Sequence, residues 1–390
     1  MKLRKILPFF LLAATLLMTA SCKGDSGVQN TVTTEPETEK AEVQQTESET
    51  EKSYYVAYTP EEKPKDVPTH THPLTGLSSD KDISTKRPVS IMVNNIQQSL
   101  PQSGLAGADI IYECLAEGGI TRLMMITTNY ENLTKIGSVR SARDYYIDFA
   151  QSYDCIFTHA GGSTYAYSTI KNRKLNNIDG VKGPTGNAFK RDQNRINAGY
   201  AYEHTLFIPN GKKLASAVDS LGYRKTVEKG YETPMHFTEW GDIISLDKTV
   251  KHVKVIMSQI QTVDFVYNEK EMVYYRFQYN GKAHMDEAAK KQLSFKNVIL
   301  MYNDCGSISG DAKHRIWMQT TGEGKGYYIT QGTYREIIWK KANATAPIKY
   351  YYTDGTEVEL NRGKTMINVV SNPTKSSVKF DNDTKLLNKK

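Results

Sequence analysis

Apolar residues recur along this chain in two different patterns, and the change between them limits the folds that it can adopt. From about residue 88 to residue 222, short apolar runs alternate with segments whose apolar positions have helical spacing. The runs are residues 88–93, 108–115, 122–127 and 154–158, and the helical segments are residues 141–153, 163–171 and 211–221. Such alternation is typical of α/β layers. We therefore expect an α/β domain over residues 67–222, with Ser141 capping its first helix.

From about residue 234 the pattern is nearly all strand. Runs rich in Val, Ile, Tyr and Phe occupy residues 252–257, 263–267, 273–279, 297–302 and 334–339. Asn280-Gly281 and Asp354-Gly355 are dipeptides that favour tight hairpins, and residues 322–326 (GEGKG) are also predicted to form a hairpin turn. We expect a second, mainly antiparallel β domain (α+β) over residues 234–371, followed by a frayed polar tail over residues 372–390.

The first residues have the layout of an export signal. Three basic residues precede an apolar run over residues 6–18, and small residues lead into Cys22. Since a bilayer span needs roughly 20 apolar residues, we expect a cleaved signal peptide at residues 1–21. A cysteine in this position resembles a lipobox, which implies a lipid anchor on Cys22 at the outer face of the cell membrane. Thr19 departs from the aliphatic residue usual there, so secretion with a free thiol and an uncleaved anchor are the alternatives.

Residues 22–66 have the composition of a disordered spacer. Residues 23–66 carry eleven acidic and five basic side chains and almost no large aliphatic ones, so they bury too little apolar surface to offset the entropy of ordering. Residues 67–390 carry a net charge of +10. A basic body favours anionic envelope polymers or membrane headgroups as partners. Nucleic acid has the right charge but does not fit an exported chain.

The other cysteines say little about the function of the chain. Cys114, Cys155 and Cys305 form no Cys-x-x-Cys pair and have no zinc spacing. We interpret them as small buried hydrophobic residues, with a disulfide between Cys114 and Cys155 as the alternative. We expect no metal and no cofactor, because the histidines are scattered along the chain.

Six segments of the first half carry a resemblance to a known family. They are residues 87–95 (RPVSIMVNN), 101–105 (PQSGL), 108–113 (ADIIYE), 117–122 (EGGITR), 136–143 (IGSVRSAR) and 159–163 (HAGGS). Together they resemble the YerB-like family of bacterial lipoproteins, over roughly residues 74–370, with weaker matches at residues 297–299 and 322–325. The resemblance implies export, anchoring and a two-domain body. It implies no activity, because the family has none assigned.

Two arginines at the start of the first expected helix are candidate anion ligands. Arg140 and Arg143 flank Ser141 where a helix start presents free N–H groups and a positive dipole end. The alternative is that both guanidinium groups form structural ion pairs with Asp144, Asp148 or Glu113.

A second cluster surrounds Gly118-Gly119. Glu113 and Glu117 bracket this turn, and one alternative is that they face a common cleft, where two carboxylates could act on a glycosidic bond as acid and base. Arg122 lies beside them and favours plain ion pairing instead. A polar network that holds the turn against the sheet is the preferred interpretation.

The third cluster is the segment from His159 to Ser163, at the end of an expected strand. Carboxyl ends of strands line the ligand crevice in α/β sheets. We expect His159 to line a ligand site together with Asn95 and His204. The alternatives are a structural histidine, or catalysis with His159 as base and Ser163 as nucleophile.

Two functional hypotheses follow from the sequence. The first is a membrane-anchored surface lipoprotein that binds an anionic cell-wall polymer or an envelope protein through a cleft in the first domain. The second is an envelope hydrolase or transferase that acts on a surface glycan with Glu117 or His159 as acid or base. We prefer the first, because no complete set of nucleophile, base and acid is visible.

Overall fold

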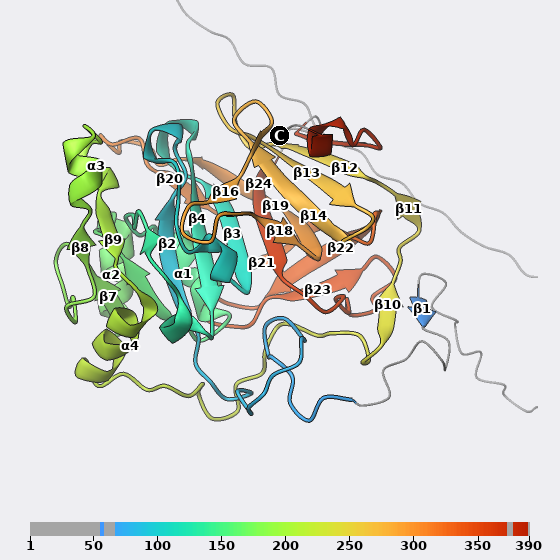
Figure 1. Ribbon diagram of the computed structural model, residues 1–390, viewed down its shortest axis with the longest axis horizontal. Coiled ribbons are helices and arrows are strands. Elements are labelled where there is room, and N and C mark those ends of the chain that lie inside the picture. Colours follow the sequence, from blue (N-terminus) through green and yellow to red (C-terminus); the bar gives the residue numbers. More distant parts are fainter. Residues whose placement is uncertain (1–54, 58–66, 373–376, 389–390) are drawn as a thin grey trace, which may run out of the picture. The chain divides into compact units, whose positions relative to one another are not determined.

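One large sheet of the computed structural model takes strands from both halves of the chain (Figure 1). The structure describes residues 55–57, 67–372 and 377–388. In this part of the chain the sheet has twelve strands. Ten of them lie side by side in the order β11 (Lys248–Thr249), β22 (Thr333–Lys341), β21 (Gly322–Thr330), β19 (Asn297–Ser307), β24 (Thr365–Asn372), β3 (Ile110–Leu115), β4 (Thr121–Thr127), β2 (Val89–Asn94), β6 (Ile156–His159) and β7 (Asn177–Asp179). The other two are β20 (Ile316–Met318), which pairs with β19, and β23 (Lys349–Tyr352), which pairs with β22.

The apolar runs of the first half form strands because both faces of the sheet are covered there. All six residues of β2 and all seven of β4 are buried, as expected where a sheet is packed on both sides. β2, β6 and β7 run parallel, with Val89 opposite Ile156 and Phe157 opposite Asn177. The carboxyl ends of these three strands therefore meet at one edge.

Strand β24 joins the two halves. It lies between β3 and β19 and runs parallel to both, with Thr365 opposite Ile110 on one side and Asn297 on the other. The described residues of the two halves belong to one compact unit. Because the second half supplies a strand next to β3, neither half completes the sheet alone.

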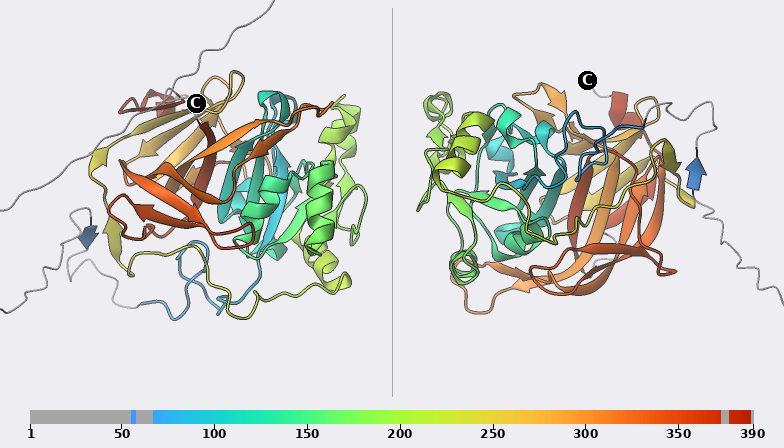
Figure 2. Two further views of the ribbon diagram at one scale, coloured as in Figure 1. Left: turned by 180° about the vertical axis from the view of Figure 1, so that it is seen from behind. Right: turned by 90° about the horizontal axis from the view of Figure 1, so that it is seen from below.

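Three helices lie where the helical spacing predicts them, and α3 was not predicted. α1 and α2 lie side by side over the sheet (Figure 2). In the described part of the chain the helices are α1 (Asp144–Gln151), α2 (Thr164–Asn172), α3 (Gln193–Asn197) and α4 (Gly211–Ser220), and the 3₁₀ turns are η1 (Gln97–Ser99), η2 (Leu105–Gly107), η3 (Glu117–Gly119), η4 (Tyr130–Asn132), η5 (Tyr202–His204) and η6 (Lys385–Asn388). Ser163 caps α2, since its side chain accepts a hydrogen bond from Ala166 N.

The expected cap at Ser141 is wrong, because α1 begins at Asp144 with Arg143 as its N-cap residue. Residues 140–143 are held in an extended path along the strand ends instead. Arg140 N donates to Met92 O, and Ala142 N donates to Gly161 O, both at 2.9 Å. These long-range bonds outweigh the local helical preference.

The second half is mainly antiparallel β, as predicted. Its own sheet has six strands: β15 (Lys282–Ala283), β14 (Val273–Gln278), β13 (Thr262–Asn268), β12 (His252–Ile256) and β25 (Val378–Asp381) in order, with β18 (Ser294–Phe295) beside β14. The smaller sheets are β5 (Ile136–Gly137) with β9 (Leu206–Ile208) and β8 (Lys190–Arg191), β1 (Tyr55–Ala57) with β10 (Asp242–Ile244), and β16 (Met285–Asp286) with β17 (Lys291–Gln292).

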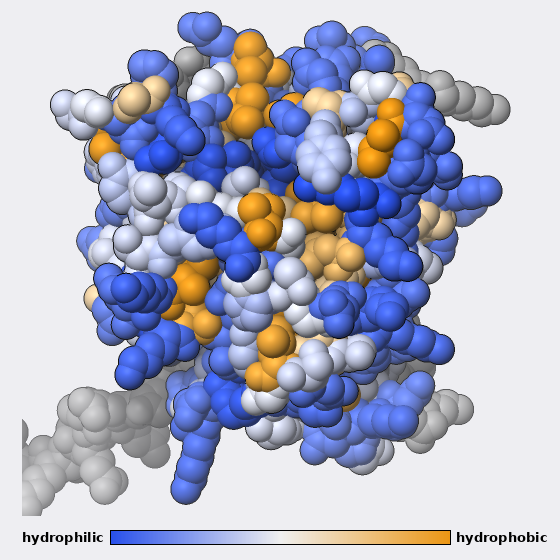
Figure 3. Space-filling model, turned by 90° about the vertical axis from the view of Figure 1, so that its left-hand side faces the viewer, coloured by the Kyte–Doolittle hydropathy of each residue, from blue (hydrophilic) through white to orange (hydrophobic). Residues whose placement is uncertain are grey.

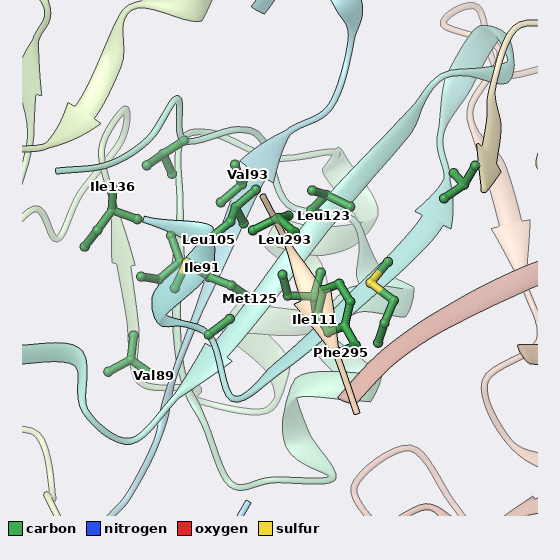
Figure 4. Packing of buried hydrophobic residues seen from close by; sticks show 14 of the residues in the cluster. Val89, Ile91, Val93, Leu105, Ile111, Leu123, Met125, Ile136, Leu293 and Phe295 are labelled. Atoms are coloured by element: carbon green, nitrogen blue, oxygen red, sulfur yellow. The ribbon is translucent and has the colours of Figure 1, made fainter. Parts of the chain in front are cut away.

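The hydrophobic core is shared by both halves. Figure 4 shows Leu293 and Phe295 of the second half beside Ile111 and Leu123 of the first, all within one buried cluster. On the face that carries α3 and β8, hydrophobic residues form separate spots among hydrophilic ones (Figure 3). Cys114 and Cys155 are buried, Cys305 is partly buried, and all three thiols are free. The interpretation as small hydrophobic residues holds for the two buried cysteines, and the alternative disulfide is absent.

Two local predictions of the second half are wrong. Residues 322–326 form the start of β21 rather than a hairpin turn. The glycines are needed for close packing there, because a Cβ on Gly324 would lie 2.5 Å from Nε1 of Trp339. The expected polar tail contains strand β25, which pairs with β12. Its Phe380 stacks on Tyr334 with ring centroids 4.3 Å apart, so two alternating apolar residues suffice to dock this strand.

The expected signal peptide and Cys22 lie outside the described residues, and so does the expected spacer except Tyr55–Ala57, which form β1. No helix in the part of the chain that the structure describes is both long and apolar enough for a bilayer span.

Candidate functional site

Three arginines gather at the carboxyl edge of the parallel strands. Arg140 and Arg143 lie on the extended segment that crosses the ends of β2 and β6, where Ala160 N donates to Arg140 O at 2.9 Å. Arg122 lies on β4, and its Nη1 donates a hydrogen bond to Ser141 O. α1 and α2 both begin at this edge, directly after Arg143 and Ser163. Two helix N-termini and three guanidinium groups therefore place positive charge in one region.

Glu117 is the carboxylate that balances part of this charge. It lies on η3, where Gly118 adopts φ 65°, a conformation that a glycine reaches without strain. Its Oε1 accepts a hydrogen bond from Arg143 Nε, and its Oε2 lies 3.6 Å from Nη2 of Arg122. Burial alone would raise the pKa of Glu117, but the hydrogen bond and charge of Arg143, helped by Arg122, hold that pKa below its ordinary value.

Arg140 forms no close ion pair with a carboxylate among the residues that the structure describes. Its Nη1 makes a 3.4 Å hydrogen bond to the backbone oxygen of Glu203, and its Nε is buried without a partner. Burial is the main cause that lowers the pKa of Arg140; the charges of Glu203 and Glu117 act against it, and the charge of Arg143 lowers the pKa further. Arg122 is affected in the same way, with burial and then Arg143 lowering its pKa to about 10. Positive charge thus exceeds negative charge in this cluster.

The partners differ from those that the sequence suggested. Arg143 pairs with Glu117, while Asp148 pairs with Arg173 at 2.7 Å. Ser141 contributes its backbone oxygen as the acceptor for Arg122.

Glu113 does not share a cleft with Glu117. Its side chain is fully buried, and Oε2 accepts hydrogen bonds from Arg276 Nη2 at 2.8 Å and Asn368 Nδ2 at 2.9 Å. Its Oε1 accepts from Thr121 Oγ1 at 2.7 Å and from Asn95 Nδ2 at 3.1 Å. The alternative of two carboxylates in a common cleft is therefore wrong, because the two side chains bind different partners on the two sides of the turn at Gly118-Gly119.

Arg276 and Asn368 are residues that sequence reasoning missed. Arg276 on β14 and Asn368 on β24 are both fully buried and both reach Glu113. The visible signal was a single arginine within an otherwise apolar and aromatic strand, VYYRFQ. A buried charge needs a charged partner, but the sequence did not tell which carboxylate it would be.

His159 is a buried structural group. Its ring is fully buried, Nδ1 donates to Gly161 O at 2.8 Å, and Nε2 accepts from Asn177 Nδ2 at 3.3 Å. Burial lowers the pKa of His159 more than nearby Asp179 raises it, so the ring is neutral at pH 7. Ser163 Oγ already accepts the capping bond of α2. Neither side chain is placed for the acid–base or nucleophilic role that the sequence left open.

Asn95 directly follows β2, and His204 bonds to Asn94, the last residue of that strand. Asn95 is buried, donates to Thr121 Oγ1 at 2.8 Å, and accepts from Gln102 Nε2 at 2.9 Å. It therefore supports the site without lining it. His204 Nδ1 accepts from Asn94 Nδ2 at 2.9 Å, which leaves the ring proton on Nε2. Burial, then the charge of Arg140, lowers the pKa of His204 and keeps the ring neutral.

A cavity of about 900 Å³ opens beside His204, between the two halves of the chain. The first half contributes η1, Ile120 and the segment before η5, and the second half contributes residues 260–261 and the hairpin residue after β14. The lining residues are Ile96, Gln97, Gln98, Ile120, Ala198, Gly199, Tyr200, Ala201, His204, Ile260, Gln261 and Tyr279. The described residues contain no group of three or more His, Cys, Asp or Glu placed to hold a metal.

Two family descriptions match this chain, one in each half. The model described as "Protein of unknown function (DUF3048) N-terminal domain" matches residues 74–224, and its C-terminal counterpart matches residues 253–367. "Putative lipoprotein YerB" of Bacillus subtilis (strain 168) is 28% identical over 311 residues, which cover 78% of this chain and 88% of that protein. The crystal structure of YerB protein from Bacillus subtilis has a TM-score of 0.68 and 27% identity, and the match covers 80% of this chain and 99% of that one.

Proposed function

This chain belongs to the YerB-like family of unknown function, and from that premise we propose that it is an envelope lipoprotein that binds an anionic polymer. In this proposal residues 1–21 are removed on export, and a lipid on Cys22 anchors the chain at the outer face of the cell membrane. The acidic residues 22–66 form a spacer for two domains, residues 67–222 and 234–371. The similarity to a protein named as a lipoprotein supports the anchor.

The observation that carries the binding proposal is the excess of guanidinium groups around Arg140. Arg140 is partly buried, forms no close ion pair in the described part of the chain, and lies beside two more guanidinium groups that share Glu117. A unit charge about 4 Å from another interacts by roughly 4 kcal/mol near a protein surface. A phosphate or carboxylate of the ligand is therefore attracted to this region, because the carboxylates of Glu117 and Glu203 together balance only part of the charge of the three guanidinium groups.

The geometry of guanidinium groups fits oxyanions. A planar guanidinium donates two parallel hydrogen bonds to a phosphate or carboxylate, and the N-termini of α1 and α2 add partial positive charge. A repeating anionic polymer also presents several such groups in sequence, so weak contacts act together. An envelope protein with an acidic surface is the second partner class that the same charge would attract.

A sedimentation assay with purified cell-wall sacculi tests this proposal. The full chain, purified in detergent, is mixed with sacculi that retain their phosphodiester polymers and with sacculi stripped of them. We expect retention on the first and not on the second, with retention falling as salt rises. Arg140→Ala should reduce retention about tenfold, while Lys212→Ala, which removes an exposed charge from α4, should leave it unchanged. Equal retention on both sacculi, or equal loss in both variants, would contradict the proposal.

The hydrolase alternative is not proposed. Glu117 is held as a carboxylate by two guanidinium groups, and His159 is fully buried with both ring nitrogens bonded.

A further inference from the structure

The cavity beside His204 differs in chemistry from the arginine cluster next to it. Its lining residues include no Lys, Arg, Asp or Glu. Polar groups are supplied by three glutamines, Gln97, Gln98 and Gln261, and by the neutral ring of His204. Two tyrosines, Tyr200 and Tyr279, add aromatic surface. Amide groups and aromatic rings without charge suit a neutral ligand that carries hydroxyl or amide groups.

The two tyrosines are fixed in place by their hydroxyl groups. Tyr200 OH donates to Leu100 O at 3.0 Å, and the guanidinium of Arg195 lies 4.8 Å from the centre of its ring. Tyr279 OH donates to Asn95 O. Because both hydroxyls are already bonded, the ring carbons are the part of each tyrosine that remains for contact with a ligand. Rigid aromatic surfaces of this kind receive the C–H face of a pyranose ring at a small cost in side-chain entropy.

Hydrogen bonds to buried residues also hold two polar side chains of the cavity wall in place. Gln261 is buried, and its Nε2 donates to Glu113 Oε1 at 3.3 Å, which connects the cavity to the buried ion pair between Glu113 and Arg276. His204 Nδ1 is occupied by Asn94, so the Nε2–H is the free donor of the ring at the cavity wall. A site whose polar side chains are already held in place binds its ligand at a smaller entropic cost, because fewer side chains must become ordered.

We propose that this cavity binds a neutral N-acetylated pyranoside unit of the envelope polymer. The acetamido group pairs with glutamine amides, the hydroxyls meet the remaining amides and His204, and the ring packs on tyrosine. Its volume of about 900 Å³ lies in the range of small-molecule sites. The inference rests on the proposed function. Glu203 connects the two sites, since its backbone oxygen binds Arg140 and the next residue is His204, so neutral and anionic parts of one chain have adjacent places.

Calorimetric titration of the full chain in detergent with the N-acetylglucosamine tetramer tests the inference, with the glucose tetramer as the matched probe. We expect saturable binding of the first and at least tenfold weaker binding of the second. Gln98→Ala, at an exposed residue, should raise the Kd about three- to tenfold, and Tyr200→Ala about fivefold or more. Tyr351→Ala, on β23 away from the cavity lining, is the control and should leave the Kd unchanged.

The outcomes separate this inference from the proposed function. The Arg140→Ala variant should still bind the tetramer, but its retention on the anionic sacculi should be lost. Absence of tetramer binding at millimolar concentration, with retention on sacculi intact, would overturn the cavity assignment alone. Equal affinity for the two tetramers would overturn recognition of the acetamido group. Tetramer binding that depends on Gln98 and Tyr200, without any preference for anionic sacculi, would support the cavity while contradicting the proposed function.

Discussion

Replacing Glu113 with glutamine should destabilise the fold strongly, because it breaks the buried ion pair that connects the two halves. Glu113 and Arg276 are both fully buried, and Oε2 and Nη2 are 2.8 Å apart. Removal of one partner leaves a buried charge without compensation, which typically costs about 3–5 kcal/mol. The new amide would also face the Asn368 amide group that now donates to Oε2, placing donor against donor.

The free energy of unfolding, from urea denaturation followed by tryptophan fluorescence, measures this effect. We expect Glu113→Gln to lose about 3–5 kcal/mol, and the double variant Glu113→Gln/Arg276→Met to lose less, because the unpaired charge is gone. Glu323→Gln is the matched control, since its ion pair with Lys340 lies at the surface and should change stability by less than about 1 kcal/mol.

A loss below about 1 kcal/mol for Glu113→Gln would refute this reasoning. So would a double variant that is less stable than the single one, because the argument assigns the cost to the charge left behind on Arg276.

Three more predictions concern His252, Phe380 and Cys22. Burial alone would lower the pKa of His252, but its hydrogen bonds with Asp264 and Asp381, both at 2.9 Å, raise that pKa above 6.5. The contribution of His252 to the free energy of unfolding should therefore be full below pH 6.5 and be lost as the pH rises through the higher pKa of the folded state. Comparison of unfolding free energies of native and His252→Gln chains across pH measures this, and a difference that does not change with pH would contradict it. Phe380→Ala should cost about 1–3 kcal/mol and speed amide exchange in β25, whereas unchanged exchange would show that stacking does not hold this strand. Cys22→Ala should move the chain from the membrane fraction to the medium, and a variant that stays with the membranes would exclude the lipid as the anchor.

The sequence alone was sufficient for the elements that depend on local spacing. The apolar runs that became β2, β3, β4 and β6 and the helical segments of α2 and α4 were placed within a few residues, because periodicity records which side of each element is buried. Prediction from local spacing failed where a contact between distant residues outweighs the local preference for a turn or a tail. Residues 322–326 looked like a turn, but the packing of Trp339 against Gly324 requires glycine in a strand. The sequence predicts a tail in place of the short strand β25, because Phe380 has no stacking partner until the fold brings Tyr334 near.

For the candidate site, the sequence determined which residues carry charge, and tertiary structure decided how those charges pair. Arg140, Arg143 and Glu117 were recognisable from residue type and from their place at strand and helix ends. Nothing local indicated that Glu113 would pair with Arg276, 163 positions away along the chain, or that Arg140 would form no close ion pair among the described residues. Pairing depends on which strands become neighbours, and the insertion of β24 beside β3 decides that. The residue type determines which functional group a side chain carries, whereas its pKa, its exposure and its partner depend on distances that only the folded chain creates.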